Sequence, residues 1–166
     1  MGVYYHYANF TRRERFGVDA VGGGIKLSNL GYTLASRAFH LFLAGSSGRK
    51  EDTPRHGLGR WAGDSVAIVG DDLVPDWEQF KAEFTDIEAN AILVVFRADG
   101  FEEIGAVAQG DTRLFMQLCH LAVTRQVPEL EPHLKQTFGG RYLARYKELC
   151  QQGQFEPKDL VMPAEP

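Results

Sequence analysis

The apolar positions of the chain alternate in one short segment, form a short β-branched run in another, and recur at helical spacing over most of the remainder. Residues 3–9 are rich in aromatic side chains and alternate, which predicts a strand with its odd-numbered side chains on one face. Residues 65–69 are β-branched and apolar, and they predict a second strand that pairs with the first. The segment between residues 9 and 24 carries charge and glycine and predicts a connection.

A longer apolar pattern predicts a helix from about residue 28 to residue 44. Apolar side chains cover most of its circumference and leave a narrow polar strip, so we expect this helix to be largely buried. Residues 45–59 contain glycine, serine, proline and charge, and they predict an exposed loop.

The second half of the chain predicts further helices. Thr85 and Glu88 have the spacing of a capping box before an apolar run that ends at Gly100. Residues 91–96 of this run also fit a buried strand, and we favour a helix. The other predicted helices cover residues 76–84 with Pro75 in the first turn, a segment capped by Asp111, a segment that ends near Phe138, and a segment from Tyr142 to Gly153.

These elements predict an α+β fold, in which a small N-terminal antiparallel sheet packs with a mostly helical remainder. The length of 166 residues predicts a single globular domain over residues 1–155. The Pro- and Glu-rich residues 156–166 predict a mobile tail.

The charge of the chain is unevenly distributed. Between Asp64 and Asp111 there are twelve acidic residues against two basic ones, Lys81 and Arg97, whereas residues 1–60 carry an excess of basic residues. The total of −4 therefore conceals a strongly acidic middle segment. Because such a distribution governs the choice of partner, we expect a basic partner.

Several compartments and partners are disfavoured by the composition. No apolar run approaches the length that spans a bilayer, and the first residues lack the pattern of a secretion signal, so we predict a cytoplasmic protein with no membrane contact. Cys119 and Cys150 fit a reducing compartment as free thiols. The pI of about 5.7 argues against nucleic acid, despite the cluster of Arg12, Arg13 and Arg15.

One set of short motifs resembles a known group of sequences. The chain is similar to small uncharacterised bacterial proteins that share an aromatic N-terminal strand, a Gly-x-Gly-x-Lys-Leu stretch and a Trp-Ala-Gly-Asp…Gly-Asp motif. The resemblance covers roughly residues 3–72 and implies a bacterial, cytoplasmic protein without implying an activity. The matching residues are Tyr5, Tyr7, Asn9, Arg13-Glu14, Gly22, Gly24, Lys26-Leu27, Trp61-Ala62-Gly63-Asp64 and Gly70-Asp71.

Candidate chemistry is sparse. The glycine run at residues 22–28 fits neither the Walker pattern nor the dinucleotide fingerprint, and it is typical of a turn before a helix. Asp64, Asp71 and Asp72 flank the second strand and would be the ligands of a metal-dependent phosphoester hydrolase. Their spacing matches no calcium loop, so we predict no metal site, no cofactor and no catalytic residue.

Arg37 and His40 lie on the polar strip of the predicted buried helix. An unpaired charge there would be costly, so we predict a structural ion pair between Arg37 and a carboxylate, with Asp64 as the first candidate and Asp71 as the second.

The function that fits these observations is a protein-binding module, and we expect binding rather than catalysis. One form is an immunity protein or inhibitor that presents an acidic surface to a basic toxin or nuclease. The alternatives are the metal-dependent hydrolase and a self-assembling structural domain. The predicted partner-binding residues are Trp61, Asp71, Asp72, Asp76, Glu78 and Glu83.

Overall fold

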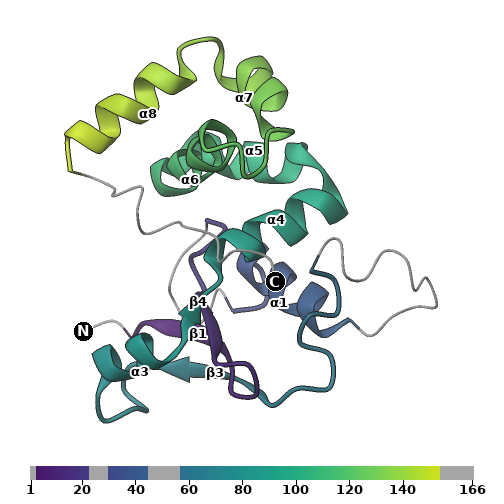
Figure 1. Cartoon of the computed structure of the whole chain (residues 1–166), viewed down its shortest axis with the longest axis vertical. Coiled ribbons are helices and arrows are strands. Elements are labelled where there is room, and N and C mark those ends of the chain that lie inside the picture. The colour runs from purple at the N-terminus through teal and green to yellow at the C-terminus, as the bar shows by residue number, and fades with distance from the viewer. Residues whose placement is uncertain (1–2, 23–29, 45–56, 154–166) are drawn as a thin grey trace. The chain divides into compact units, whose positions relative to one another are not determined.

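The computed structural model describes residues 3–22, 30–44 and 57–153 (Figure 1). Internal contacts divide the chain into two compact units, Met1–Ala98 and Asp99–Pro166. The first unit contains the sheet and the second contains helices. The prediction of one globular domain over residues 1–155 stays a prediction.

The sheet of the first unit has four strands in the order β3-β1-β2-β4. Strand β1 (Tyr5–Asn9) pairs antiparallel with β2 (Glu14–Gly17) on one side and with β3 (Val66–Gly70) on the other. The α+β prediction is confirmed, and so is the pairing of the two predicted strands. The sheet is mixed rather than purely antiparallel, because the short β4 (Thr85–Asp86) runs parallel to β2.

The prediction that residues 9–24 form only a connection is wrong, because Glu14–Gly17 within it form strand β2 and make a hairpin with β1. Arg13, between the two strands, has a φ of 55°, and this left-handed residue lets the chain reverse within four residues. Charged residues in β2 hid its strand character, because Glu14 and Arg15 come directly before Phe16 and Gly17 and break the alternation of polar and apolar positions.

Helix α1 (Leu34–Leu43) covers the face of the sheet that carries Tyr7, whose ring stacks on Phe39 with centroids 4.5 Å apart. Thr33 caps the helix by accepting a hydrogen bond from the backbone N–H of Ser36. The helix therefore begins later than the predicted residue 28. Residues 30–32 form a turn, Tyr32 is 92% exposed, and part of the predicted loop at 45–59 lies outside the described residues, as do residues 23–29.

Helix α3 (Trp77–Glu83) covers the opposite face of the sheet. Its Phe80 packs in a cluster with Ala8, Val69 and Phe84, and Asp76 caps its start. The predicted helix at residues 76–84 is confirmed, with Pro75 one residue before the cap instead of in the first turn.

Helix α4 (Glu88–Asp99) confirms that residues 91–96 are helical. The predicted capping box is wrong, because Thr85 belongs to β4 and its N–H donates to the carbonyl of Arg13. The side chain of Asp86 instead accepts a hydrogen bond from the N–H of Glu88. A Thr-x-x-Glu pattern cannot distinguish a cap from a strand that pairs with a distant segment.

The second unit contains helices α5 (Phe101–Gly110), α6 (Thr112–Val123), α7 (Leu130–Phe138) and α8 (Tyr142–Gln151). Asp111 caps α6 as predicted, by accepting from the N–H of Leu114. The sequence analysis missed α5, although Phe101, Ile104 and Ala108 form a buried face at helical spacing. The predicted tail at residues 156–166 lies outside the described residues.

Candidate functional site

Trp61 lies in the aromatic core between the sheet and α1. Its side chain is 0% exposed, and its ring contacts Phe16 and Phe42 with centroids 5.5 and 5.2 Å away. The indole N–H donates to the Glu14 carboxylate at 2.7 Å. In this structure Trp61 has no surface open to a partner, and its role in partner binding stays a prediction.

The Glu14 carboxylate is the centre of a buried polar cluster that the sequence analysis missed. Besides Trp61, Arg60 donates to it twice, from Nε at 2.9 Å and from Nη2 at 2.5 Å. Burial by itself raises the pKa of Glu14, but the hydrogen bonds from Arg60 and Trp61 outweigh it and hold the pKa below its ordinary value. Glu14 is therefore ionised at neutral pH, and it connects β2 to the turn before β3.

Asp64 makes a second connection between the hairpin and that turn. Its Oδ2 accepts hydrogen bonds from Nδ2 of Asn9 at 2.8 Å and from Nε of Arg12 at 2.7 Å. These two hydrogen bonds lower the pKa of Asp64. The predicted ion pair of Asp64 with Arg37 stays a prediction, while the structure shows the carboxylate occupied by Asn9 and Arg12.

The carboxylates of the alternative metal site do not come together. Asp64 precedes the first residue of β3, whereas Asp71 and Asp72 follow its last residue. At about 3.3 Å per residue, the extended strand separates the two groups by roughly 20 Å. Within the described ranges, no group of three or more His, Cys, Asp or Glu side chains could hold a metal ion. The structure therefore does not bring these carboxylates together, and the metal-dependent hydrolase stays an alternative prediction.

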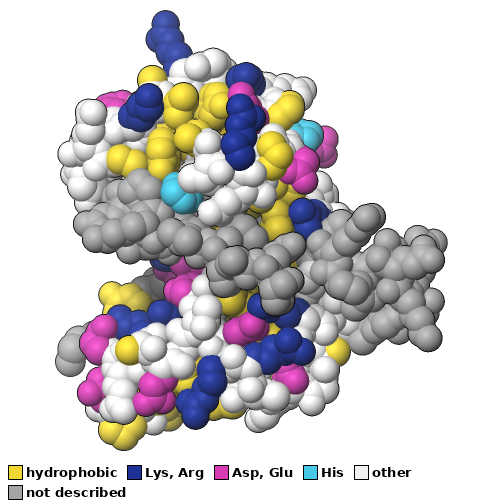
Figure 2. Space-filling view, in the orientation of Figure 1, with side chains coloured by type: hydrophobic (Ala, Val, Ile, Leu, Met, Phe, Trp, Pro, Cys, Tyr) yellow, Lys and Arg dark blue, Asp and Glu magenta, His cyan; other side chains and the backbone are white. Residues whose placement is uncertain are grey.

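The basic cluster near the N-terminus neutralises part of the acidic middle segment. Arg12 pairs with Asp64, Arg13 Nη1 lies 3.3 Å from Glu83 Oε2, and Arg15 Nη1 lies 2.8 Å from Asp86 Oδ2. Acidic and basic side chains accordingly lie next to one another over the sheet-containing unit (Figure 2). Part of the charge that is segregated in the sequence is thus paired in the fold.

Two of the predicted partner-binding residues, Glu78 and Glu83, form ion pairs in the structure. Glu83 also accepts a hydrogen bond from Gln79, and Glu78 Oε1 lies 2.6 Å from Lys81 Nζ. Both carboxylates lie on α3 and remain accessible, but their charge is balanced locally. Exposed pairs of this kind contribute little to stability, so a partner could replace either basic residue at small cost.

The remaining predicted residues lie in the turn between β3 and α3, residues 71–76, hereafter the acidic turn. In the described part of the chain, Asp71, Asp72 and Asp76 take part in no ion pair that the structure shows. Asp71 accepts a hydrogen bond from the N–H of Tyr4 at 3.2 Å, and Asp76 accepts one from the N–H of Gln79. Among the described residues, the acidic turn therefore keeps a net negative charge that no ion pair cancels.

An apolar side chain lies within the acidic turn. Leu73 is 72% exposed, and its backbone N–H donates to the carbonyl of Gly70, which fixes the turn. Tyr4, opposite Asp71, is 54% exposed. An exposed leucine and an exposed tyrosine therefore lie beside carboxylates that form no ion pair among the described residues.

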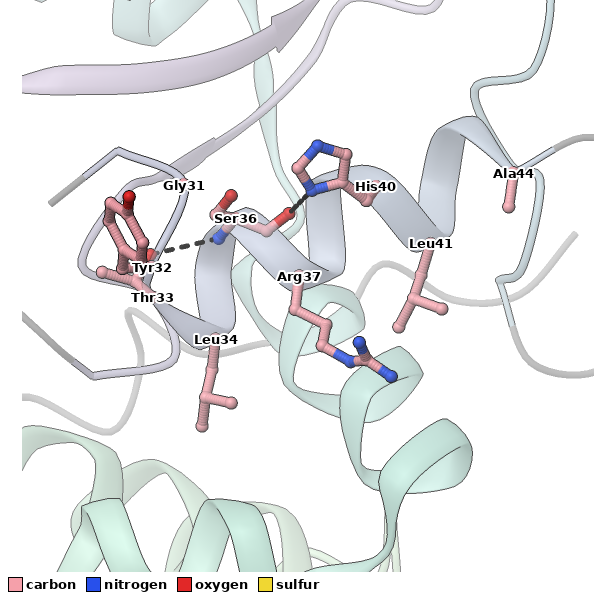
Figure 3. A pocket seen from close by; sticks show the side chains of 9 residues that line it. All are labelled: Gly31, Tyr32, Thr33, Leu34, Ser36, Arg37, His40, Leu41 and Ala44. Atoms are coloured by element: carbon pink, nitrogen blue, oxygen red, sulfur yellow. Dashed lines mark hydrogen bonds between the residues drawn. The ribbon is translucent and has the colours of Figure 1, made fainter.

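A separate hollow of about 470 Å³ runs along α1 and includes Arg37 and His40 (Figure 3). His40 donates from Nδ1 to the carbonyl of Ser36 at 2.8 Å. Figure 3 shows the side chain of Arg37 on one side of the helix and that of His40 on the other. Because the two groups diverge, they do not form a convergent site for one ligand.

The two thiols belong to the second unit. Cys119 is buried, Cys150 is half-buried, and both are free. Burial, with a smaller contribution from Cys150, raises the pKa of Cys119 to about 12. A thiol that stays protonated at neutral pH is a poor nucleophile.

The hydroxyl of Tyr146 and Nδ1 of His120 form a hydrogen bond of 2.9 Å beside these thiols. Burial, then the neighbouring Cys150, raises the pKa of Tyr146 to about 12, and burial lowers the pKa of His120. The shifts of Cys119, His120 and Tyr146 all favour the neutral forms of these side chains. The cluster thus has the character of a core, without an activated group.

Comparison of the chain with protein-family models, with curated proteins and with solved structures finds no match. The resemblance to uncharacterised bacterial proteins therefore stays a prediction. No helix in the described ranges combines the length and apolar composition needed to cross a bilayer.

Proposed function

We propose that this chain is a protein-binding module that presents the acidic turn to a basic partner. The observation that carries the proposal is the contrast among the acidic residues of the middle segment. Asp64, Glu83 and Asp86 are paired with arginines, whereas Asp71 and Asp72 form no such pair in the structure and flank the exposed Leu73. Complementary charge steers association, and an apolar contact at its centre slows dissociation.

In its finer form, the proposal is a cytoplasmic immunity protein or inhibitor that blocks a basic toxin or nuclease. The net charge of −4 and the carboxylates of the acidic turn favour a basic partner over an acidic one. Masking a basic active surface requires only binding, and in the second unit burial favours the neutral forms of the Cys119 thiol and the His120 imidazole.

The test is an affinity capture from an extract of the native host with three forms of the chain. The first is the wild type, and the second combines Asp71→Asn with Asp72→Lys. Asparagine at position 71 keeps the oxygen that accepts from Tyr4, so the turn is preserved. The third combines Glu102→Gln with Glu103→Lys, which makes the same change of charge at exposed positions of α5 in the other unit.

A basic protein retained by the wild type and by the α5 variant, but lost with the acidic-turn variant, would support the proposal. Retention should also weaken as the ionic strength rises, because exposed charges are screened. Equal retention by all three forms would refute it. Light scattering of the purified chain, independent of any partner, tests the alternative of a self-assembling structural domain.

A further inference from the structure

We infer that the outer edge of β3 binds an extended, basic segment of the partner as an additional strand of the sheet. The inference rests on the proposed function and specifies how the partner is held. It concerns the backbone of Val66, Ile68 and Gly70, which precede the acidic turn directly.

The register of the sheet shows which backbone groups of β3 face outward. The N–H of Phe10 donates to the carbonyl of Ser65, and the N–H of Asp71 donates to the carbonyl of Tyr4. In an antiparallel pair, hydrogen-bonded residues alternate with residues whose N–H and C=O point the other way. With Ala8 opposite Ala67 and Tyr7 opposite Ile68, the groups of Val66 and Ile68 point away from β1.

These outward groups have no backbone partner among the described residues. Strand β3 is the last strand on its side of the sheet, and Figure 1 shows it at the sheet's margin. The carbonyl of Gly70 accepts from Leu73, but the structure shows no acceptor or donor for the N–H and C=O of Val66 and Ile68. The edge thus offers two N–H and C=O pairs at the spacing that an added strand requires.

The edge is also unprotected by its sequence. Exposed edge strands are usually blunted by lysine, proline, an inward charge or a bulge. Strand β3 has the sequence Val-Ala-Ile-Val-Gly, contains none of these, and pairs with β1 in continuous register. Ile68 is 40% exposed beside the open backbone groups, so an apolar side chain of an added strand would gain a contact.

Charge identifies the occupant as a segment with basic residues at one end. Asp71 and Asp72 follow the edge directly, without an ion pair in the described structure, whereas Asp64 at the other end is already bound by Arg12. A strand with lysine or arginine beside the acidic turn and alternating apolar residues along Ile68 satisfies both features. A second copy of this chain would bring no comparable basic group from its own β3.

Two synthetic hexapeptides test this mode of binding: Lys-Lys-Val-Thr-Val-Thr and the reversed order Thr-Val-Thr-Val-Lys-Lys, both with blocked termini. The first places its lysines beside the acidic turn in antiparallel addition, and the second does so in parallel addition. Binding of either should slow the hydrogen exchange of the Val66 and Ile68 amides, measured by NMR. The amides of Ala67 and Val69, which already bond to β1, serve as internal controls.

Peptides with N-methyl groups on the residues that face β3 provide the decisive comparison. They keep the charge and the side chains but cannot donate to the edge, so their affinity should fall about tenfold or more. In the protein, Ile68→Pro removes an outward N–H without removing a bond to β1, and it should abolish the protection. If circular dichroism shows that this variant is unfolded, Ile68→Lys provides the alternative way to blunt the edge.

The outcomes separate this inference from the proposed function. Equal affinity of methylated and unmethylated peptides, lost with Asp71→Asn/Asp72→Lys, would overturn strand addition and leave the acidic surface supported. Protection of the edge that is insensitive to that variant and to salt would support strand addition and contradict the role of charge. The inference would be overturned if neither hexapeptide protected the amides of Val66 and Ile68. It would also be overturned if light scattering showed a dimer of the chain that Ile68→Lys converts to a monomer.

Discussion

Strand β3 begins after the segment Trp61-Ala62-Gly63-Asp64 and ends at Gly70-Asp71-Asp72, so each end carries a glycine followed by an aspartate. At the first end, Asp64 accepts hydrogen bonds from Asn9 and Arg12, and Trp61 is fully buried. At the second end, Asp72 is exposed and Leu73 projects from the surface. Similar sequence signals therefore mark a structural connection at one end and a candidate binding surface at the other.

Glycine occupies positions 63 and 70, at the two ends of β3, for different physical reasons. Gly63 has a φ of 80°, a backbone conformation that other residues adopt only with strain. Gly70 is closely packed, because a Cβ there would lie 3.0 Å from Cγ1 of Val3 and 3.1 Å from Cε1 of Tyr5, and the exposed Asp72 side chain would have to move aside. The first end of β3 is thus fixed by conformation and buried polar contacts, and the second by close packing beneath an exposed turn.

The largest expected effect is at the first end. Trp61→Ala removes a side chain with no exposed surface from a cluster of aromatic rings. We expect it to lower the free energy of unfolding by about 3–5 kcal/mol, as measured by urea denaturation. The matched change at the second end, Leu73→Ala, should alter it by no more than about 0.5 kcal/mol. Comparable losses at both ends would contradict the assignment of the acidic turn to the surface.

A smaller effect is expected from Glu14→Gln. The glutamine keeps the shape of the side chain but loses the charge that faces Arg60, and its amide N–H₂ opposes the donors of Arg60 and Trp61. Because hydrogen bonds to charged groups contribute more than neutral ones, we expect a loss of about 1.5–3 kcal/mol. Unchanged stability in chemical denaturation would mean that the cluster does not hold the hairpin to the turn before β3.

The pH dependence of stability sharpens this prediction. The folded-state pKa of Glu14 is lower than that of the unfolded chain, which is near 4.5. Its contribution is therefore fully present above about pH 4.5 and is lost as the pH falls through the lower folded-state value. The wild type should lose stability below this pH, and Glu14→Gln should lose less over the same interval. Parallel pH profiles from thermal unfolding would rule out a stabilising ionised Glu14.

Much of the fold was predictable because the signals that identify it are local. The alternation at residues 3–9 and the β-branched run at 65–69 identify β1 and β3, and the apolar spacing after Asp111 identifies α6. Strands β2 and β4 were not predictable in this way. Each is short and charged, and each becomes a strand only through a hydrogen-bonded neighbour that lies elsewhere in the sequence.

The acidic composition of the candidate site was predictable, but the ion pairs that its carboxylates form within the chain were not. The sequence shows an acidic middle segment, but the pairing of Arg12, Arg13 and Arg15 with its carboxylates depends on the hairpin and on β4. The burial of Trp61 depends in the same way on Glu14, 47 residues away, which accepts its indole N–H. Which aspartates remain without an ion pair is a property of the three-dimensional arrangement.

The finest test of the comparison is the same substitution at both ends of β3. Asp64→Asn replaces the carboxylate that accepts from Arg12 and Asn9, so we expect the urea midpoint of unfolding to fall. Asp72→Asn changes an exposed carboxylate that has no hydrogen bond in the described structure, and it should leave the midpoint unchanged. For binding of a basic peptide, Asp72→Asn should weaken the affinity and its salt dependence, whereas Asp64→Asn should leave both intact in the folded chain. If the two variants exchanged these roles, the charge at the first end of β3 would be the one that serves recognition.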